Sequence, residues 1–535
     1  MAKQVLFNSE AKKAFKEGVN IVSDAVGSTL GAAGKTVIIS NFHSVPPYAT
    51  KDGVSVVSSI QLEDEIQNVG ALFVRQASQK TMELAGDGTS TTVVLAQSLI
   101  NNGLSAVESG CNPQDLKIGM DKAIAVVVDE IKSMAETVGD SNEKIRQVAT
   151  ISANNDSVIG NLIGDAYAKI GNNPEGLLVI EESGTIETKI EVMDGVEIPR
   201  GYMSPHFANN KDKMEFNYED CFILVADYTI SQMKDFVPLF NQIAEKNLMA
   251  TPILIVAQDF EGEAYSSMLQ NNVRGNVKCC LMKAPSSYRK ETMDDIAILT
   301  GATMLSDANG LKLEHAKIEH LGKAKKIVVS EKKCLIIKGD GQPSKVAAHI
   351  HEISLQRDEL KTTDALRDVW NKRLANLSGR IGVIKVGGAT DVEVKEKKDR
   401  VDDACRAVKS AIEEGIVTGG GVSLLRCSEK LVGMNLDGPQ MEGVKIVDKM
   451  LYAPLKKMIG NAGLDNKETL IIATILSSGE KGYGYNIKTR SYENLLENGV
   501  IDPVKVIRCA LQNAASVAGA IITSDCLIVE MKEKK

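Results

Sequence analysis

The strongest constraint on the fold of this chain is a difference in apolar spacing between its two ends and its middle. Near the N-terminus, Phe15, Val19, Val22 and Val26 recur at steps of four, three and four, which is the spacing of one face of an α-helix. Similar spacing continues through residues 66–77, 123–134, 412–431 and 504–520. Both ends of the chain are therefore predicted to be mainly helical.

The middle of the chain has a different pattern of apolar residues, with short apolar runs in place of long helical faces. These runs lie at residues 177–180, 222–225, 253–256 and 277–282. Segments with helical spacing separate several of them, at 236–246, 263–274 and 292–299, and a longer helical stretch at 350–377 precedes a strand at 383–386. Strands that alternate with helices are typical of α/β architecture. We therefore expect an α/β domain inserted into a helical one.

Chain length and polarity predict a soluble protein of several domains. At 535 residues the chain has room for two to four domains, since one domain takes roughly 150 residues. It lacks the uninterrupted run of about 18 apolar residues that a membrane span needs. Residues 1–10 are polar and do not resemble a secretory signal, which favours a cytoplasmic location. The nine cysteines include no C-x-x-C pair, which favours reduced thiols.

Charge and aromatic content argue against nucleic-acid binding. The net charge is −8 without a clustered basic stripe, and aromatic residues make up 4% of the chain. Electrostatic attraction to a phosphate backbone needs clustered basic residues, and stacking on bases needs aromatic side chains. The six histidines show no ligand-like grouping apart from His349 and His351, whose spacing does not share a helix face, so they suggest no metal site.

The segment Gly34-Lys35-Thr36 has the ending of a P-loop but fails the rest of the motif. The position that requires the first glycine holds Thr29, and an apolar strand follows at 37–39 where a P-loop has a helix. A metabolic phosphotransferase of the P-loop type is therefore disfavoured.

A stronger candidate for phosphate binding is the segment Gly86-Asp87-Gly88-Thr89-Ser90-Thr91-Thr92, which joins two predicted helices. Glycines allow close backbone approach, a helix N-terminus attracts anions, and an aspartate can hold magnesium. The same residues also fit a glycine C-cap followed by a Thr or Ser N-cap with no ligand at all.

Two further glycine turns, residues 29–34 and 419–421, strengthen this candidate. Either could be an ordinary flexible turn. Together with the first turn, they could converge on one triphosphate, accompanied by the carboxylates Asp52, Asp87, Asp403 and Asp502. The run 395–400 fits a solvated helix face better than a phosphate site.

In combination, these segments resemble group I (GroEL-type) chaperonins. The resemblance runs from about Ala2 to about Val529, and its motifs occur in the family's order. They are Thr29-Leu30-Gly31, Thr50-Lys51-Asp52-Gly53-Val54-Ser55-Val56, Gly86-Asp87-Gly88-Thr89, Ile151-Ser152-Ala153-Asn154, Arg200-Gly201-Tyr202, Lys395-Glu396-Lys397-Lys398, Gly419-Gly420-Gly421, Tyr483-Gly484-Tyr485-Asn486 and Asp502-Pro503.

The resemblance implies a multidomain GroEL-like chaperonin fold with three domains, two of them discontinuous in sequence. A mainly α-helical equatorial ATPase domain is expected from 1–134 and 414–535, and a small α/β intermediate domain from 135–193 and 382–413. The α/β apical domain that binds substrates is expected from 194–381.

It also implies a nucleotide site for ATP or ADP, with Mg²⁺ and K⁺ as candidate ions. The phosphate and metal side would be formed by Thr29, Leu30, Gly31, Lys51, Asp87, Gly88, Thr89, Ser90 and Thr91, with Asp87 as the metal ligand. The base and ribose side would be formed by Gly420, Asn486, Ile487 and Asp502. Asp403 would orient the attacking water, assisted by Asp52.

In the apical domain the resemblance implies an apolar groove for unfolded chains and a lid-like co-chaperonin. The matching residues are Tyr202, His206, Phe207, Val237, Phe240, Ala244, Tyr265 and Leu269. Ordinary core packing is the alternative for each, since apolar helix faces are usually buried.

The function that follows is an ATP-driven chaperone ring, expected to be heptameric with one or two rings, that encloses non-native proteins. A nucleotide-binding ring that only holds or organises proteins is the alternative. The departures from the family pattern are Ala32, Lys488, Arg380, Asn241, Gln270, His206 and an end at residues 531–535 without a Gly-Gly-Met tail.

Overall fold

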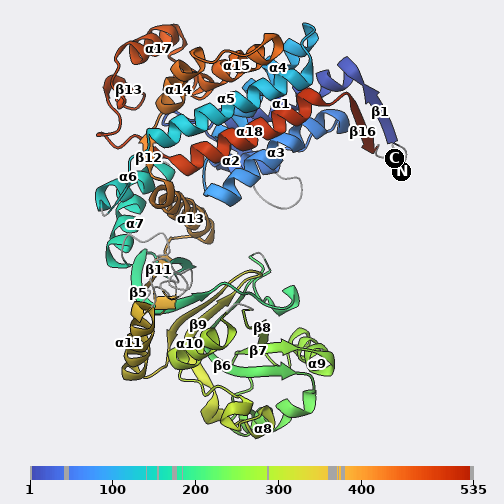
Figure 1. Ribbon diagram of the computed structural model, residues 1–535, viewed down its shortest axis with the longest axis vertical. Coiled ribbons are helices and arrows are strands. Elements are labelled where there is room, and N and C mark those ends of the chain that lie inside the picture. Colours follow the sequence, from blue (N-terminus) through green and yellow to red (C-terminus); the bar gives the residue numbers. More distant parts are fainter. Residues whose placement is uncertain are drawn as a thin grey trace. The chain divides into compact units, whose positions relative to one another are not determined.

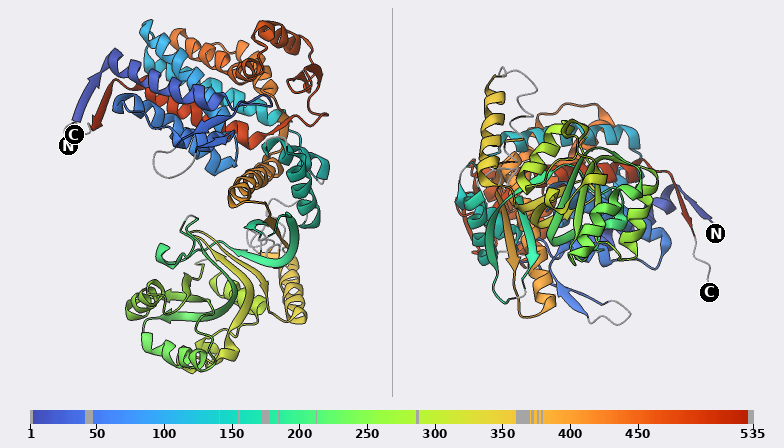
Figure 2. Two further views of the ribbon diagram at one scale, coloured as in Figure 1. Left: turned by 180° about the vertical axis from the view of Figure 1, so that it is seen from behind. Right: turned by 90° about the horizontal axis from the view of Figure 1, so that it is seen from below.

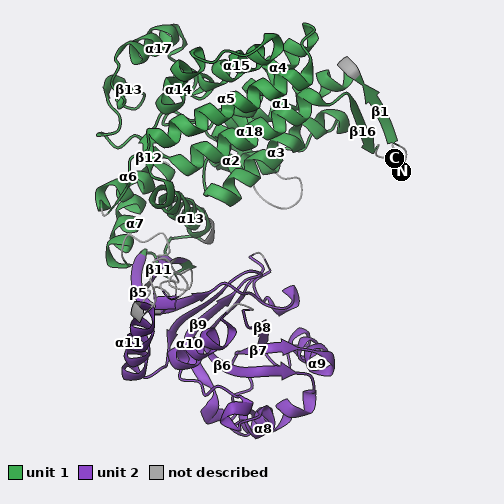
Figure 3. Cartoon of the chain, viewed as in Figure 1, with its two compact units in different colours: residues 1–174, 180–188, 386–535 green, residues 175–179, 189–385 purple. Residues whose placement is uncertain are grey.

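The computed structural model describes residues 3–530, except 41–46, 140, 154–155, 171–176, 184, 212, 286–287, 360–369, 371–372, 375–376 and 378–379. The chain forms two compact units (Figure 3). Unit 1 comprises Met1–Pro174, Ile180–Thr188 and Val386–Lys535, and unit 2 comprises Glu175–Val179 and Lys189–Lys385. The segments expected to form an intermediate domain fall mainly in unit 1, together with both chain ends.

Unit 1 is built around the helix α18, Val504–Thr523, with other long helices packed on it (Figure 1). Its partners are α3 (Glu65–Ala85), α4 (Thr89–Glu108) and α5 (Pro113–Ser133), and α1 (Asn8–Gly27) packs on α3 and α4. The helix starts follow from the sequence, because Asp64 caps α3 and Asn112 caps α5 ahead of Pro113.

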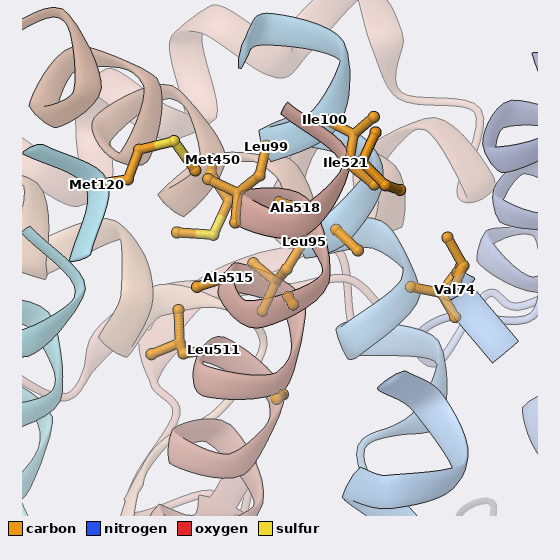
Figure 4. Close-up of a cluster of buried hydrophobic side chains, with 14 of the residues drawn as sticks. Val74, Leu95, Leu99, Ile100, Met120, Met450, Leu511, Ala515, Ala518 and Ile521 are labelled. Carbon is orange, nitrogen blue, oxygen red and sulfur yellow. The ribbon is translucent and has the colours of Figure 1, made fainter. Parts of the chain in front are cut away.

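The core of unit 1 is formed by apolar side chains from these helices (Figure 4). Leu95 and Leu99 of α4 are completely buried, as is Leu511 of α18. Within the described chain, α18 is the one helix long and apolar enough to cross a membrane, but most of its apolar stretch is buried inside the unit. It has the burial of a core helix.

Further elements complete unit 1. The helices are α2 (Gly53–Ser59), α6 (Asn142–Ser152), α7 (Ser157–Ile170), α13 (Asp391–Glu414), α14 (Val422–Val432), α15 (Gly438–Leu451), α16 (Ala453–Asn461) and α17 (Glu468–Ser477). Four antiparallel pairs are β1 (Lys3–Phe7) with β16 (Cys526–Glu530), β2 (Val37–Ile39) with β3 (Tyr48–Thr50), β12 (Ile416–Thr418) with β15 (Ile501–Pro503), and β13 (Tyr483–Asn486) with β14 (Ser491–Asn494). The β1–β16 pair places the two ends of the chain side by side (Figure 2).

The prediction of one helix over residues 412–431 is wrong. α13 ends at Glu414, the strand β12 follows, and α14 begins only at Val422. Gly415 takes a φ of 86° and ends α13, and the buried Ile416 and Val417 pair with β15. Ile416 and Val417 continue the helical spacing of apolar residues by chance, and for this reason the sequence pattern did not predict the strand.

Unit 2 contains most of an eight-stranded mixed sheet with the order β4-β11-β5-β10-β9-β6-β7-β8. The strands are β4 (Leu177–Glu182), β5 (Lys189–Ile198), β6 (Phe216–Ile230), β7 (Ile253–Phe260), β8 (Cys279–Lys283), β9 (Gly322–Val329), β10 (Cys334–Gly339) and β11 (Arg380–Val386). The parallel neighbours β6, β7 and β8 are linked through α8 (Val237–Glu245) and α9 (Gly262–Val273), as the βα alternation predicted.

The described part of unit 2 also contains α10 (Arg289–Thr300) and α11 (Pro343–Glu359). Short 3₁₀ turns are η1 (Pro205–Phe207), η2 (Met233–Phe236), η3 (Asp307–Asn309), η4 (Leu313–His315) and η5 (Ile318–His320), with η6 (Asp465–Lys467) in unit 1. The helix expected over 350–377 is described as far as Glu359, and residues 360–369 of that prediction lie outside the described chain, as does the end at 531–535.

Candidate active site

A cavity of about 1460 Å³ lies within unit 1, at the ends of several of its elements. The residues expected at the nucleotide site all line it, although they come from separate stretches of the chain. They are Thr29, Leu30, Gly31, Lys51, Asp52, Asp87, Gly88, Thr89, Ser90, Thr91, Asp403, Gly420, Asn486, Ile487 and Asp502. The rejected P-loop segment precedes the strand β2, and of its three residues only Thr36 lines the cavity.

The turn that follows α1 forms one wall of the cavity. Thr29 Oγ1 donates to Val26 O at 2.8 Å and lies 3.2 Å from Ser90 Oγ. Asn461 of α16 donates to the carbonyls of Gly27 and Leu30, both at 2.9 Å. The turn is therefore fixed from both sides before any ligand binds.

The first turn of α4 forms a second wall. Gly88 precedes it with a φ of 90° and gives it no side-chain cap, so the leading amides of the helix keep their donors available. Gly88 also has no room for a side chain, since an added Cβ would lie 2.7 Å from Val506 Cγ1. The positive end of a 20-residue helix dipole therefore faces a cavity lined by Thr89, Ser90 and Thr91, which suits a phosphate group.

Asp87 lies between these walls and is held by two hydrogen bonds. Its Oδ1 accepts from the Gly88 amide at 2.5 Å, and its Oδ2 accepts from Ser152 Oγ at 2.9 Å. Burial raises its pKa, the two hydrogen bonds oppose that rise, and the charge of Asp52 adds to it.

Two more carboxylates have strongly raised pKa values. Burial, with the charges of Asp87 and Asp52, raises the pKa of Asp403 on α13 to about 8. Burial and the charge of Asp87 raise the pKa of Asp502 on β15 to about 7. Without a ligand, these two carboxyl groups therefore hold their protons up to near neutral pH, and a cation bound beside them would favour the ionised forms.

The donor set fits Mg²⁺ better than a metal held by protein alone. Among the described residues there is no group of three or more His, Cys, Asp or Glu side chains that could hold a metal ion. Mg²⁺ binds through one or two carboxylates and completes its shell with water and substrate phosphates. Asp87 is the carboxylate placed beside the phosphate-binding amides of α4.

Asp52 is the N-cap of α2. Its Oδ1 accepts from the Val54 amide at 3.1 Å, and its Oδ2 accepts from the Ser55 amide at 2.7 Å. Gly53 sits against the neighbouring wall, because an added Cβ would lie 2.3 Å from Ser90 Oγ. The cap therefore fixes the Asp52 carboxylate beside the start of α4.

The apolar end of the cavity lies beside β13 and β14. Its lining includes Ile487 and Val500, and the neighbouring Gly420 has a φ of 65°. Met458 lies instead beside the turn after α1, since a Cβ added at Gly31 would be 2.6 Å from Met458 Cγ. Sequence reasoning missed several polar residues of the lining, among them Arg146, Gln147, Asn161, Glu493 and Asn498. The run 395–400, expected to be a solvated helix face, also contributes Lys395, Glu396, Asp399 and Arg400 to the lining. Glu493 could be found only through the register of the β13–β14 hairpin, which pairs it with Gly484.

The residues expected in the client groove lie in unit 2 and differ in exposure. Val237 is 46% exposed, and His206 and Ala244 are exposed as well. Tyr202, Phe240, Tyr265 and Leu269 are partly buried against the core of the unit.

Phe207 does not line an exposed groove, contrary to the expectation. Its side chain is 1% exposed, because the η1 turn directs it into the core of unit 2.

Comparison with known proteins supports one family over most of the chain. Residues 22–532 match the TCP-1/cpn60 chaperonin family. Two crystal forms of the chaperonin gp146 from the bacteriophage EL 2 (Pseudomonas aeruginosa), both in the presence of ATP-BeFx, share the fold with TM-scores of 0.66 and 0.65. Their sequence identities are 24% and 23%, and each match covers 99% of both chains. The expected GroEL-like fold is thereby confirmed, and the chain belongs to the TCP-1/cpn60 chaperonin family.

Proposed function

We propose that this chain is an ATP-hydrolysing chaperone subunit that assembles into a ring and assists the folding of non-native proteins. The observation that carries the proposal is the cavity of unit 1, where a helix N-terminus, three glycine turns and five aspartates lie together. The gp146 crystals grown in the presence of ATP-BeFx support a nucleotide as the ligand.

Different residues of the cavity have different roles in phosphoryl transfer. The amides of Thr89, Ser90 and Thr91 and the turn at Thr29 bind the phosphates. Asp87 would hold Mg²⁺, which would supply positive charge to neutralise the triphosphate. Asp403 orients the attacking water and accepts its proton, and Asp52 assists by its position at the cap of α2.

Unit 2 supplies the client-binding surface in this proposal. Val237 and the partly exposed Phe240 and Leu269 offer apolar contacts to a chain whose own core is not yet buried. A co-chaperonin lid, a heptameric assembly of one or two rings and a cytoplasmic location belong to the same proposal.

Native mass measurement and client refolding test the proposal together. We expect a multiple of the 57.6 kDa subunit mass that depends on ATP, and a denatured client whose activity returns only with ATP. A ring that suppresses aggregation but never returns active client would favour the holding function. A monomer with no effect on the client would contradict both.

A further inference from the structure

The side chain of Asn486 is fixed in one orientation at the apolar end of the cavity. Its Nδ2 donates to Glu493 Oε1 at 2.5 Å. Its Oδ1 accepts from the backbone amides of Lys488 at 2.9 Å and Thr489 at 3.4 Å. Both acceptor positions of the oxygen are therefore occupied, and only one N–H of the amide is left for a ligand.

This end of the cavity suits a nucleobase, on the premise that the proposed function is correct. The phosphates occupy the end formed by α4 and the turn at Thr29, since the free amides lie there. The part of the lining beside Asn486 offers Ile487 and Val500, which pack against one apolar cluster and match the flat apolar faces of a base. Polar groups on its rim then decide which base fits.

An asparagine normally reads adenine with both halves of its amide, because the oxygen accepts from the amino group while the nitrogen donates to a ring nitrogen. Asn486 cannot do this alone, since its oxygen is already occupied. Glu493 lines the same cavity, and its Oε2 has no hydrogen-bond partner among the described residues. The carboxylate can therefore supply the missing acceptor.

We propose that Glu493 determines nucleobase specificity by accepting a hydrogen bond from an N–H on the base edge, while the free N–H of Asn486 donates to the neighbouring acceptor. A base must then carry a donor beside an acceptor. Adenine has this pattern in its amino group and ring nitrogen, and guanine has it in N1–H and O6. Purine riboside has acceptors only.

Equilibrium binding of ATP, GTP and purine riboside triphosphate, each with Mg²⁺, tests this assignment on the full chain. For the wild type we expect ATP or GTP to bind at least about tenfold more tightly than purine riboside triphosphate, because a hydrogen bond to a charged group is lost. Glu493→Met removes both carboxylate oxygens and should reduce the ratio to less than about threefold. Glu493→Gln keeps a neutral acceptor and should restore part of it.

We expect both variants to bind purine riboside triphosphate as the wild type does, which shows that the cavity is intact. If Glu493 only supported the structure, its replacement would weaken the binding of all three nucleotides. Glu497→Met is the matched control, because Glu497 is exposed on the following loop and does not line the cavity. It should keep the wild-type ratio.

The result also identifies the base. Tighter binding of ATP assigns adenine, and tighter binding of GTP assigns guanine. Equal binding of all three nucleotides by the wild type, or a full preference retained in both Glu493 variants, overturns the inference. If none of the three binds, the proposed function itself fails and this inference fails with it.

Discussion

Thr29 Oγ1 and Ser90 Oγ lie 3.2 Å apart, although 61 residues separate them in the sequence. This contact joins the turn after α1 to the first turn of α4, the two segments with the strongest chemistry for phosphate. Asn461 fixes the first segment through two carbonyls, and Gly88 fixes the second through its backbone conformation. The phosphate end of the cavity is therefore largely preorganised.

Replacing Gly88 by alanine should disturb this end of the cavity. Both Gly88 and Gly110 have a positive φ, 90° and 95°, so alanine costs about 1–2 kcal/mol at either position. An added Cβ at Gly88 would also lie 2.7 Å from Val506 Cγ1, whereas Gly110 has nothing within 4 Å. We expect Gly88→Ala to lower the free energy of unfolding more than Gly110→Ala and to weaken nucleotide binding. Equal stability and affinity in the two variants, from denaturant unfolding and titration, would contradict the close approach.

Asp87→Lys should abolish hydrolysis, because it removes the metal carboxylate and places a cation beside the phosphate-binding amides. Glu83→Lys is the matched control, since it makes the same charge change one turn earlier, on an exposed position of α3 outside the cavity. Phosphate release with magnesium ATP measures both. Normal turnover in a folded Asp87→Lys protein would remove the metal assignment.

The carboxylates of the cavity should make ligand-free stability depend on pH. The pKa of Asp403 is raised from 3.8 to about 8, so the folded state holds this proton more tightly than the unfolded chain does. Its contribution to the free energy of unfolding is complete below pH 3.8 and is lost as the pH rises toward 8. Asp403→Asn should therefore lose less stability than the wild type between about pH 5 and pH 8.

Thermal unfolding across that range measures the effect, with the exposed Glu83→Gln as the control. The Asp502→Asn variant should act in the same direction over a lower range, since the pKa of Asp502 is raised to about 7. Adding Mg²⁺ should flatten the wild-type curve by stabilising the ionised carboxylates. If stability depended on pH identically in the wild type and in Asp403→Asn, the pKa of Asp403 would not be raised in the folded protein.

The client surface can be tested most cleanly at Val237. Phe240 packs against Phe236 with ring centroids 5.9 Å apart, so that replacing it would disturb the core as well as the surface. Val237→Ser should change stability by no more than about 0.5 kcal/mol and should reduce capture of a denatured client. Val273→Ser on α9 is the control, because Val273 is 65% exposed and lies outside the predicted groove. Suppression of client aggregation reports the difference, and equal capture by the two variants would argue against the groove.

The helices of unit 1 could be predicted from sequence because their apolar spacing reflects burial on one face. Phe15, Val19 and Val22 recur at helical steps and are all buried in α1. The same reasoning misread residues 412–431, where two buried strand residues continued the helical spacing by chance. Gly415 was the available warning, because glycine at such a position commonly ends a helix.

The members of the candidate site could be named from motifs, but their arrangement could not. Nothing in the sequence shows that Ser152 bonds to Asp87 or that Asn461 holds the turn after α1, because each contact joins distant segments. The exposure of individual side chains could not be predicted from the sequence either, as Phe207 shows. Its neighbours Pro205 and His206 are exposed, and only tertiary packing decides that the ring faces inward.

Phosphate release and ATP binding by Asp403→Ala, measured beside the wild type, test the central claim most directly. Asp402→Ala is the matched control, since Asp402 pairs with Arg406 at 2.7 Å and does not line the cavity. If the chain is an ATPase of the proposed kind, the wild type and Asp402→Ala hydrolyse ATP. Asp403→Ala then binds ATP with little change but releases phosphate at least about tenfold more slowly, a barrier increase of about 1.4 kcal/mol or more. Equal turnover in all three proteins, or no turnover by the wild type, would contradict the account.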